Sequence, residues 1–133
     1  MTESDLLFDT WAWWEYLHDT EVGARLRARY IVSGKSRIHT SAISLGELAA
    51  QLAGQGALGR VSEACGAIRR MSHIWDVTGD IAQEAGVART KLRQHASQAS
   101  LADGIIVATA QRAGARIVSN DPAFIGQPGV IRG

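Results

Sequence analysis

LLFDTWAWWEYLH, residues 6–18, joins a short apolar segment to a helical pattern without a turn between them. Residues 6–9 have the length and composition of a short buried strand. Trp11 and Trp14 lie three residues apart, which places them on one face of a helix. A strand that leads directly into a helix favours an α/β fold.

The same alternation continues to the end of the chain. Further strands are predicted at 37–40, 73–77 and 116–119, with a short edge strand at 129–132. Helices are predicted at 21–34, 44–53, 61–71, 80–96 and from about Asp103 to Gly114. Strands separated by helices form a parallel sheet with helices on both faces. We therefore expect a three-layer α/β/α domain around a central parallel sheet of four to five strands.

Length and composition set the broad class. The 133 residues suit one domain, 1–133, and 46% hydrophobic with 20% charged residues is a globular composition. Cys65 is the only cysteine, which excludes an intrachain disulfide. No apolar run approaches the roughly 20 residues that span a bilayer, and the N-terminus lacks the pattern of a secretory signal. We expect a cytoplasmic protein without a membrane partner.

The charge balance is nearly neutral. Fourteen basic and thirteen acidic residues give a formal net charge of +1, which is no electrostatic signature of nucleic-acid binding. Most of the basic residues are arginines, whose guanidinium groups bind phosphates and carboxylates with two hydrogen bonds. Their function therefore depends on where they lie in the fold.

Four acidic residues are expected at one edge of the sheet. Asp9 ends the first predicted strand and Asp121 follows the fourth, while Glu47 and Asp103 lie in the first turns of helices. Ligands of open parallel sheets bind beyond the carboxyl ends of the strands, at the switch point. Right-handed connections would bring the two helix starts over the same edge. The four carboxylates would then share one crevice.

Each acid also has a local structural explanation. Segments 44–47 and 100–103 begin with Ser and end with an acid, as in the capping box. Asp9 would cap the helix that follows it, and Asp121 precedes a proline in a predicted turn. Convergence of all four on one edge is nevertheless better explained by a bound cation, because clustered carboxylates resist ionisation. Hard oxygen ligands favour Mg²⁺ or Mn²⁺.

Segments spread over nearly the whole chain resemble the PIN-domain nucleases, most closely the VapC-type toxin ribonucleases of toxin-antitoxin pairs. They are FDT at 8–10, SLGEL at 44–48, SLADGIIVATA at 100–110 and IVSNDPAF at 117–124. The resemblance implies a PIN-like domain whose catalytic and metal-binding residues are Asp9, Glu47, Asp103 and Asp121. It also implies that Ser119 supports the site. The bulky WAWW at 11–14 departs from the family, which often has Ser or Thr there, and Thr10 is the alternative polar residue.

The activity that this resemblance implies is metal-dependent endoribonucleolytic cleavage. With Mg²⁺ or Mn²⁺ as cofactor, metal-activated water would hydrolyse an RNA phosphodiester. The implied partners are the RNA substrate, a cognate antitoxin protein and a second copy of the chain in a homodimer. Two alternatives remain open: a receiver-like phosphoacceptor domain, and a non-catalytic PIN-like module that binds RNA or protein.

Basic and aromatic side chains are the remaining candidates for partner contacts. Arg25 and Arg29 lie four residues apart on a predicted helix, and Arg89, Lys91 and Arg93 precede the helix of Asp103. They are candidates for contacts with RNA phosphates or antitoxin carboxylates. The three tryptophans at 11, 13 and 14 are expected to anchor the core and an interface, in preference to stacking on bases.

Overall fold

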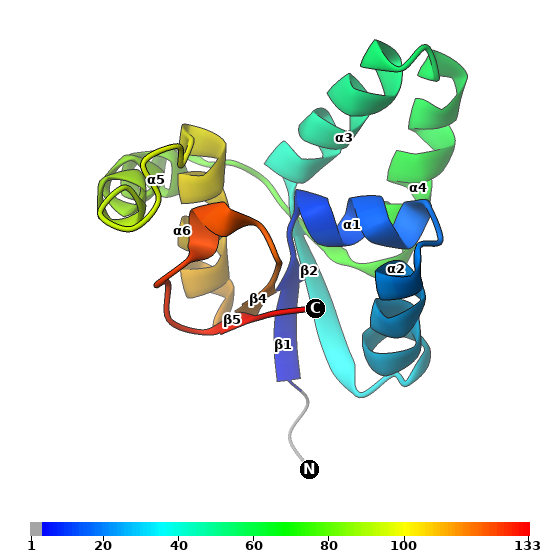
Figure 1. Ribbon diagram of the computed structural model, residues 1–133, viewed down its shortest axis with the longest axis horizontal. Coiled ribbons are helices and arrows are strands. Elements are labelled where there is room, and N and C mark those ends of the chain that lie inside the picture. The colour runs from blue at the N-terminus through cyan, green and yellow to red at the C-terminus, as the bar shows by residue number, and fades with distance from the viewer. Residues whose placement is uncertain (1–3) are drawn as a thin grey trace.

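A computed structural model describes residues 4–133 of the chain (Figure 1). Its strands are all parallel and form one five-stranded sheet. In their order across the sheet they are β3 (His73–Trp75), β2 (Ser36–Ser41), β1 (Ser4–Phe8), β4 (Arg116–Val118) and β5 (Val130–Ile131). The predicted parallel sheet is confirmed. The predicted domain span, 1–133, begins with residues 1–3, which lie outside the described residues.

Helices cover both faces of this sheet. They are α1 (Thr10–Leu17), α2 (Glu21–Leu26), α3 (Ala42–Gly54), α4 (Val61–Met71), α5 (Gly79–Leu92) and α6 (Leu101–Ala113). A π-helical segment, η1 (Arg27–Val32), continues α2, and two 3₁₀ turns are η2 (Leu58–Arg60) and η3 (Pro122–Phe124). Figure 1 shows α5 and α6 on one side of the strands and α1, α2 and α4 on the other. The three-layer α/β/α architecture is thus confirmed.

Alternation along β1 explains why both faces are covered. Leu6 and Phe8 belong to a core with α1, α2, α3 and α4, whereas Leu7 belongs to a core with α5 and α6. All three side chains are at most 2% exposed. A strand whose neighbouring side chains are all apolar buries both faces, as a central parallel strand requires.

Small residues let α5 and α6 approach each other closely. Ala85 and Ala108 are fully buried between these helices. At Gly104, an added Cβ would lie 2.3 Å from the carbonyl oxygen of Ala85. Only glycine therefore fits at this position, which lies next to Asp103 at the start of α6.

The element boundaries differ from the predictions in places where local caps decide them. β3 ends at Trp75 instead of residue 77. The helix predicted at 44–53 begins two residues earlier, at Ala42, because Ser41 is its N-cap and accepts a hydrogen bond from the backbone N–H of Ile43. None of the helices found between residues 4 and 133 has the length and apolar character needed to cross a membrane.

Candidate active site

The strand order reverses between β1 and β4, and a cavity of about 250 Å³ lies at the carboxyl ends of these two strands. This is the switch point at which open parallel sheets bind ligands. All four predicted acids line the cavity, together with Thr10. The complete lining is Asp9, Thr10, Trp11, Trp14, Glu47, Gln51, Asp103, Ile106, Asp121 and Phe124. None of these residues is Arg, Lys or His.

Asp9 is the most deeply buried of the four acids, with 3% of its surface exposed. It is the N-cap of α1, because its Oδ1 accepts a hydrogen bond of 2.9 Å from the backbone N–H of Ala12. Its Oδ2 accepts a hydrogen bond from the buried Ser119 hydroxyl, which follows β4. The predicted cap and the predicted place of Ser119 beside the site are both observed.

Asp103 and Asp121 also cap helical segments while they face the cavity. Asp103 and Ser100 form a capping box: Asp103 Oδ2 accepts from the Ser100 N–H at 2.8 Å, and Ser100 Oγ accepts from the Asp103 N–H at 3.1 Å. Asp121 Oδ1 accepts from the Ala123 N–H at 2.9 Å. The structure shows no hydrogen bond from residues 4–133 to the second oxygen of either carboxylate. Each acid therefore keeps one oxygen for a ligand.

Glu47 is placed differently from the prediction. Because α3 begins at Ala42, Glu47 lies in its second turn, and the predicted capping box of 44–47 is wrong. Ser44 is fully buried and its Oγ lies 3.1 Å from Thr10 Oγ1. Thr10 Oγ1 donates to Glu47 Oε1 at 2.6 Å. Thr10 thus contacts the acidic site directly, as predicted, whereas no sequence pattern indicated that Ser44 supports it.

Burial and mutual repulsion keep two of the carboxyl groups from ionising readily. Burial raises the pKa of Asp9 to about 7, against hydrogen bonds from Ser119 and Ala12 that lower it, and the charges of Asp121 and Asp103 raise it further. Burial also raises the pKa of Glu47, the Thr10 hydrogen bond lowers it, and the same two charges raise it. With no basic side chain in the lining, a proton or a cation has to balance these charges.

The donor set fits a hydrated divalent cation. The cavity offers carboxylate and hydroxyl oxygens with no sulfur or imidazole, which is the chemistry of Mg²⁺ and Mn²⁺ sites. Across residues 4–133, no three His, Cys, Asp or Glu side chains are arranged to hold one ion. Mg²⁺ commonly binds one or two carboxylates and keeps several waters, so a pair of these acids is sufficient.

The predicted basic contact residues lie outside the cavity lining. Arg25 and Arg29 border a separate hollow of about 100 Å³, together with Arg132. Arg93 Nε donates to the carbonyl of Ala99 at 2.9 Å, in the segment that leads into α6. Arg89 Nε is buried without a hydrogen-bond partner among the described residues. Lys91, also on α5, is exposed.

The prediction that the tryptophans anchor the core is confirmed for Trp13, and Trp11 and Trp14 pack against the same core; their role at an interface stays a prediction. Trp13 is fully buried, and its Nε1 donates to Thr40 Oγ1 at 2.9 Å. Trp11 and Trp14 are partly buried against the same core, but both also line the acidic cavity. Their three-residue spacing was the only sign in the sequence that they share a face toward Asp9.

Fold and site together define a parallel α/β protein with an acidic cavity at the switch point of its sheet. The sequence matches the PIN domain family over residues 6–127. The chain therefore belongs to the PIN-domain family. A comparison with curated proteins finds no matching sequence.

Solved structures with the same fold include several toxin-antitoxin proteins. A toxin-antitoxin complex from Klebsiella pneumoniae is 26% identical over 95% of both chains, with a TM-score of 0.65. VapBC2 from Rickettsia felis, bound to a DNA fragment from its promoter, is 18% identical over 97% of both chains, with a TM-score of 0.72. VapC20 from Mycobacterium tuberculosis, a sarcin-ricin loop cleaving toxin, is 20% identical over 91% of this chain and 95% of that chain, with a TM-score of 0.67.

Proposed function

We propose that this PIN-domain protein is a metal-dependent endoribonuclease and the toxin component of a toxin-antitoxin pair. The observation that carries the proposal is the cavity in which Asp9, Glu47, Asp103 and Asp121 meet without a basic residue. Such a site attracts a divalent cation and repels a bare phosphodiester. The cation is therefore required before the negatively charged substrate can approach.

Asp9 and Asp103 would hold the cation directly, and Glu47 and Asp121 would bind it directly or through water. When bound, Mg²⁺ or Mn²⁺ supplies Lewis-acid polarisation of the phosphodiester and acidifies water for the attack. Ser119 keeps the Asp9 carboxylate oriented through its hydrogen bond. Thr10 holds the Glu47 carboxylate at the cavity, where it can take a proton from the attacking water.

The toxin assignment rests on the PIN-domain match and on the toxin-antitoxin complexes among the structural neighbours. Under this proposal, the protein partner is a cognate antitoxin and the substrate is RNA. A homodimer and a cytoplasmic location belong to the same proposal. That residues 1–133 form a single PIN-like domain is also part of the proposal.

The strand order of the sheet argues against one of the two alternative functions and agrees with the other. A receiver-like domain has the strand order 2-1-3-4-5, whereas this sheet has the order 3-2-1-4-5. The receiver alternative therefore disagrees with the topology. A PIN-domain module that binds RNA or protein without cutting has the same topology, and only an activity measurement separates it from a nuclease.

That measurement is cleavage of total cellular RNA and of structured RNA by the purified, partner-free protein. We expect cleavage with Mg²⁺ or Mn²⁺, none with a chelator, and a loss of at least about 100-fold in Asp9→Asn and Asp103→Asn. Asp76→Asn, on an exposed residue outside the cavity, is the matched control. Equal cutting by the wild type and both site variants would reject the nuclease function, and mapping the cut ends would identify the RNA.

A further inference from the structure

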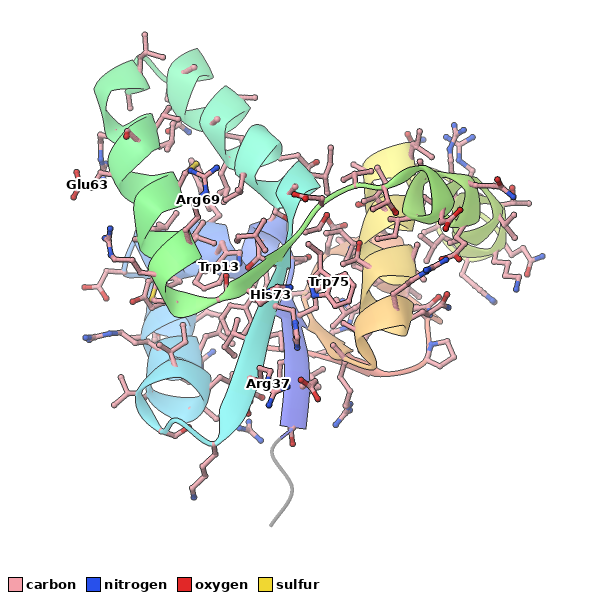
Figure 2. All side chains as sticks on the ribbon, turned by 180° about the vertical axis from the view of Figure 1, so that it is seen from behind. Trp13, Arg37, Glu63, Arg69, His73 and Trp75 are labelled. Atoms are coloured by element: carbon pink, nitrogen blue, oxygen red, sulfur yellow. The ribbon has the colours of Figure 1, made fainter. Side chains whose placement is uncertain are left out.

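The tryptophans of this chain differ in whether the indole N–H has a hydrogen-bond partner. The indole N–H of Trp13 donates to Thr40, and that of Trp75 donates to His39 Nδ1 at 3.0 Å. Figure 2 shows Trp13 on the side of the sheet that carries α4 and Trp75 on the side of α6. Trp11 and Trp14 differ, because within residues 4–133 neither indole N–H has a hydrogen-bond partner. Both of their rings line the acidic cavity.

Contacts away from the cavity hold these two rings in place. The ring of Trp14 lies against the imidazole of His18, with centroids 3.8 Å apart and planes tilted by 32°. Trp11 Cη2 lies 2.9 Å from the position that a Cβ on Gly133 would occupy. Because α1 begins directly after Asp9, the two fixed aromatic rings stand beside the carboxylates as an apolar wall of the same cavity.

A basic hollow adjoins Trp11 through Gly133. Gly133, which contacts the Trp11 ring, lines this hollow together with Arg25, Arg29 and Arg132. Arg132 Nη1 also donates to the carbonyl oxygen of Asp121 at 3.2 Å, which ties the hollow to the loop that carries the last acid. Glu21 pairs with Arg25 at 3.6 Å, but its side chain is 91% exposed. The acidic cavity, its aromatic wall and the neighbouring arginine hollow together offer one RNA strand places for the scissile phosphate, for a base and for a further phosphate.

We propose that Trp11 and Trp14 bind an unpaired nucleobase next to the scissile phosphate, and that the three arginines bind a phosphate of the same strand. This subsite rests on the proposed ribonuclease function. Proteins that bind single-stranded nucleic acid combine aromatic stacking platforms with a positively charged groove in the same way. A base inside a duplex is already stacked and cannot lie on these rings, so the substrate class is RNA with unpaired nucleotides at the cut.

The experiment measures binding of a fluorescein-labelled single-stranded RNA of mixed sequence, by anisotropy, in an Asp103→Asn background that leaves the RNA uncut. We expect Trp11→Leu and Trp14→Leu each to raise the Kd about 10-fold, since stacking on one ring contributes on the order of this factor. Trp11→Phe keeps an aromatic face, so its Kd should stay within about 3-fold of the Kd of the background protein. Trp75→Phe, on the α6 side of the sheet, should leave the Kd unchanged.

The salt dependence separates stacking from charge. Trp11→Leu should leave the slope of log K against log salt unchanged, whereas Arg132→Gln should reduce it by about 0.7, the value for one phosphate contact to a single strand. RNA should also quench tryptophan emission in the background protein, and Trp11→Phe should remove part of that quenching. The Trp11→Phe variant thus tests the subsite even if the Leu variants fail to fold.

An unchanged Kd in the Trp11→Leu and Trp14→Leu variants, together with unchanged quenching in Trp11→Phe, would overturn the base subsite. That outcome would leave the aromatic wall as a surface for a protein partner. Failure of the ribonuclease function itself is seen separately, as absence of cleavage by the wild-type protein with Mg²⁺ or Mn²⁺. A wild type that cuts RNA, with Trp11→Leu and Trp14→Leu variants that bind and cut equally well, would reject the subsite alone.

Discussion

Thr10 Oγ1 lies 2.6 Å from Glu47 Oε1, although the two residues are 37 positions apart in the chain. The same hydroxyl lies 3.1 Å from the buried Ser44 Oγ. The Thr10 hydroxyl donates, and because it has only one hydrogen, Ser44 Oγ and Glu47 Oε1 compete for it; the shorter contact goes to Glu47. This chain of hydrogen bonds joins the start of α1 to α3 and favours the ionised form of Glu47.

Thr10→Val should make Glu47 a weaker base for catalysis. Valine has the same shape but no hydroxyl, so the pKa of Glu47, already raised by burial, should rise further. We expect the acid limb of the profile of kcat/KM against pH to move to higher pH, so that activity is lost on its acid side. Thr90→Val, at an exposed position on α5, is the control and should leave the profile in place.

Asp9→Asn should stabilise the metal-free protein, and more so at higher pH. The pKa of Asp9 is about 7 in the folded protein and 3.8 as the ordinary value, so the folded state holds a proton that the unfolded state has lost between these pH values. The free energy of unfolding therefore falls as pH rises from about 4 to 7. Between pH 5 and pH 8 the loss due to Asp9 should be about 3 kcal/mol.

Urea denaturation with a chelator present measures this effect. The Asn variant should lack the part of the pH dependence that Asp9 causes, and its advantage over the wild type should grow up to about pH 7 and then level off. Asp76→Asn should follow the wild-type curve. Parallel curves for the wild type and Asp9→Asn would show that Asp9 ionises as freely in the folded protein as in the unfolded chain.

Gly104→Ala should destabilise the protein by about 2 kcal/mol or more, because its Cβ would lie 2.3 Å from a backbone oxygen of α5. Gly86→Ala, on the open side of α5, meets nothing within 4 Å and should instead stabilise it by roughly 0.5–1 kcal/mol. The change in the free energy of unfolding, measured by thermal and urea unfolding, should have opposite signs in the two variants if α5 and α6 pack this closely. The same sign for both would contradict that packing.

The fold was predictable because its signals are local. Apolar segments such as residues 6–9 and 116–119, separated by helical patterns, were sufficient for a parallel sheet with helices on both faces. The convergence of Asp9 and Asp121 followed from one rule, that the carboxyl ends of parallel strands meet at one edge. The capping box of Asp103 was also readable, because it depends on residues three positions apart.

The remaining features depend on contacts between segments far apart in the chain. Ser44 begins a Ser-x-x-Glu pattern, whereas the observed N-cap, Ser41, has no acid three residues later, and only the actual start of α3 identifies the cap. Ser44 then lies inside the helix and faces Thr10. The helical spacing of Trp11 and Trp14 predicted a shared face, but not whether that face meets the core or a cavity. Arg132 gave no sequence signal, because its contact with Asp121 requires β5 to lie beside β4.

The central claim is that the four carboxylates share a divalent cation, and calorimetric titration with Mn²⁺ tests it most directly. The wild type should bind Mn²⁺ at pH 8, bind it more weakly at pH 6, and release a proton on binding at the lower pH, because Asp9 must ionise first. Asp9→Asn and Asp103→Asn should each weaken binding by at least about 10-fold, and Mg²⁺ should compete. Equal affinity for Mn²⁺ in the wild type and both variants, or no binding by the wild type, would contradict the account.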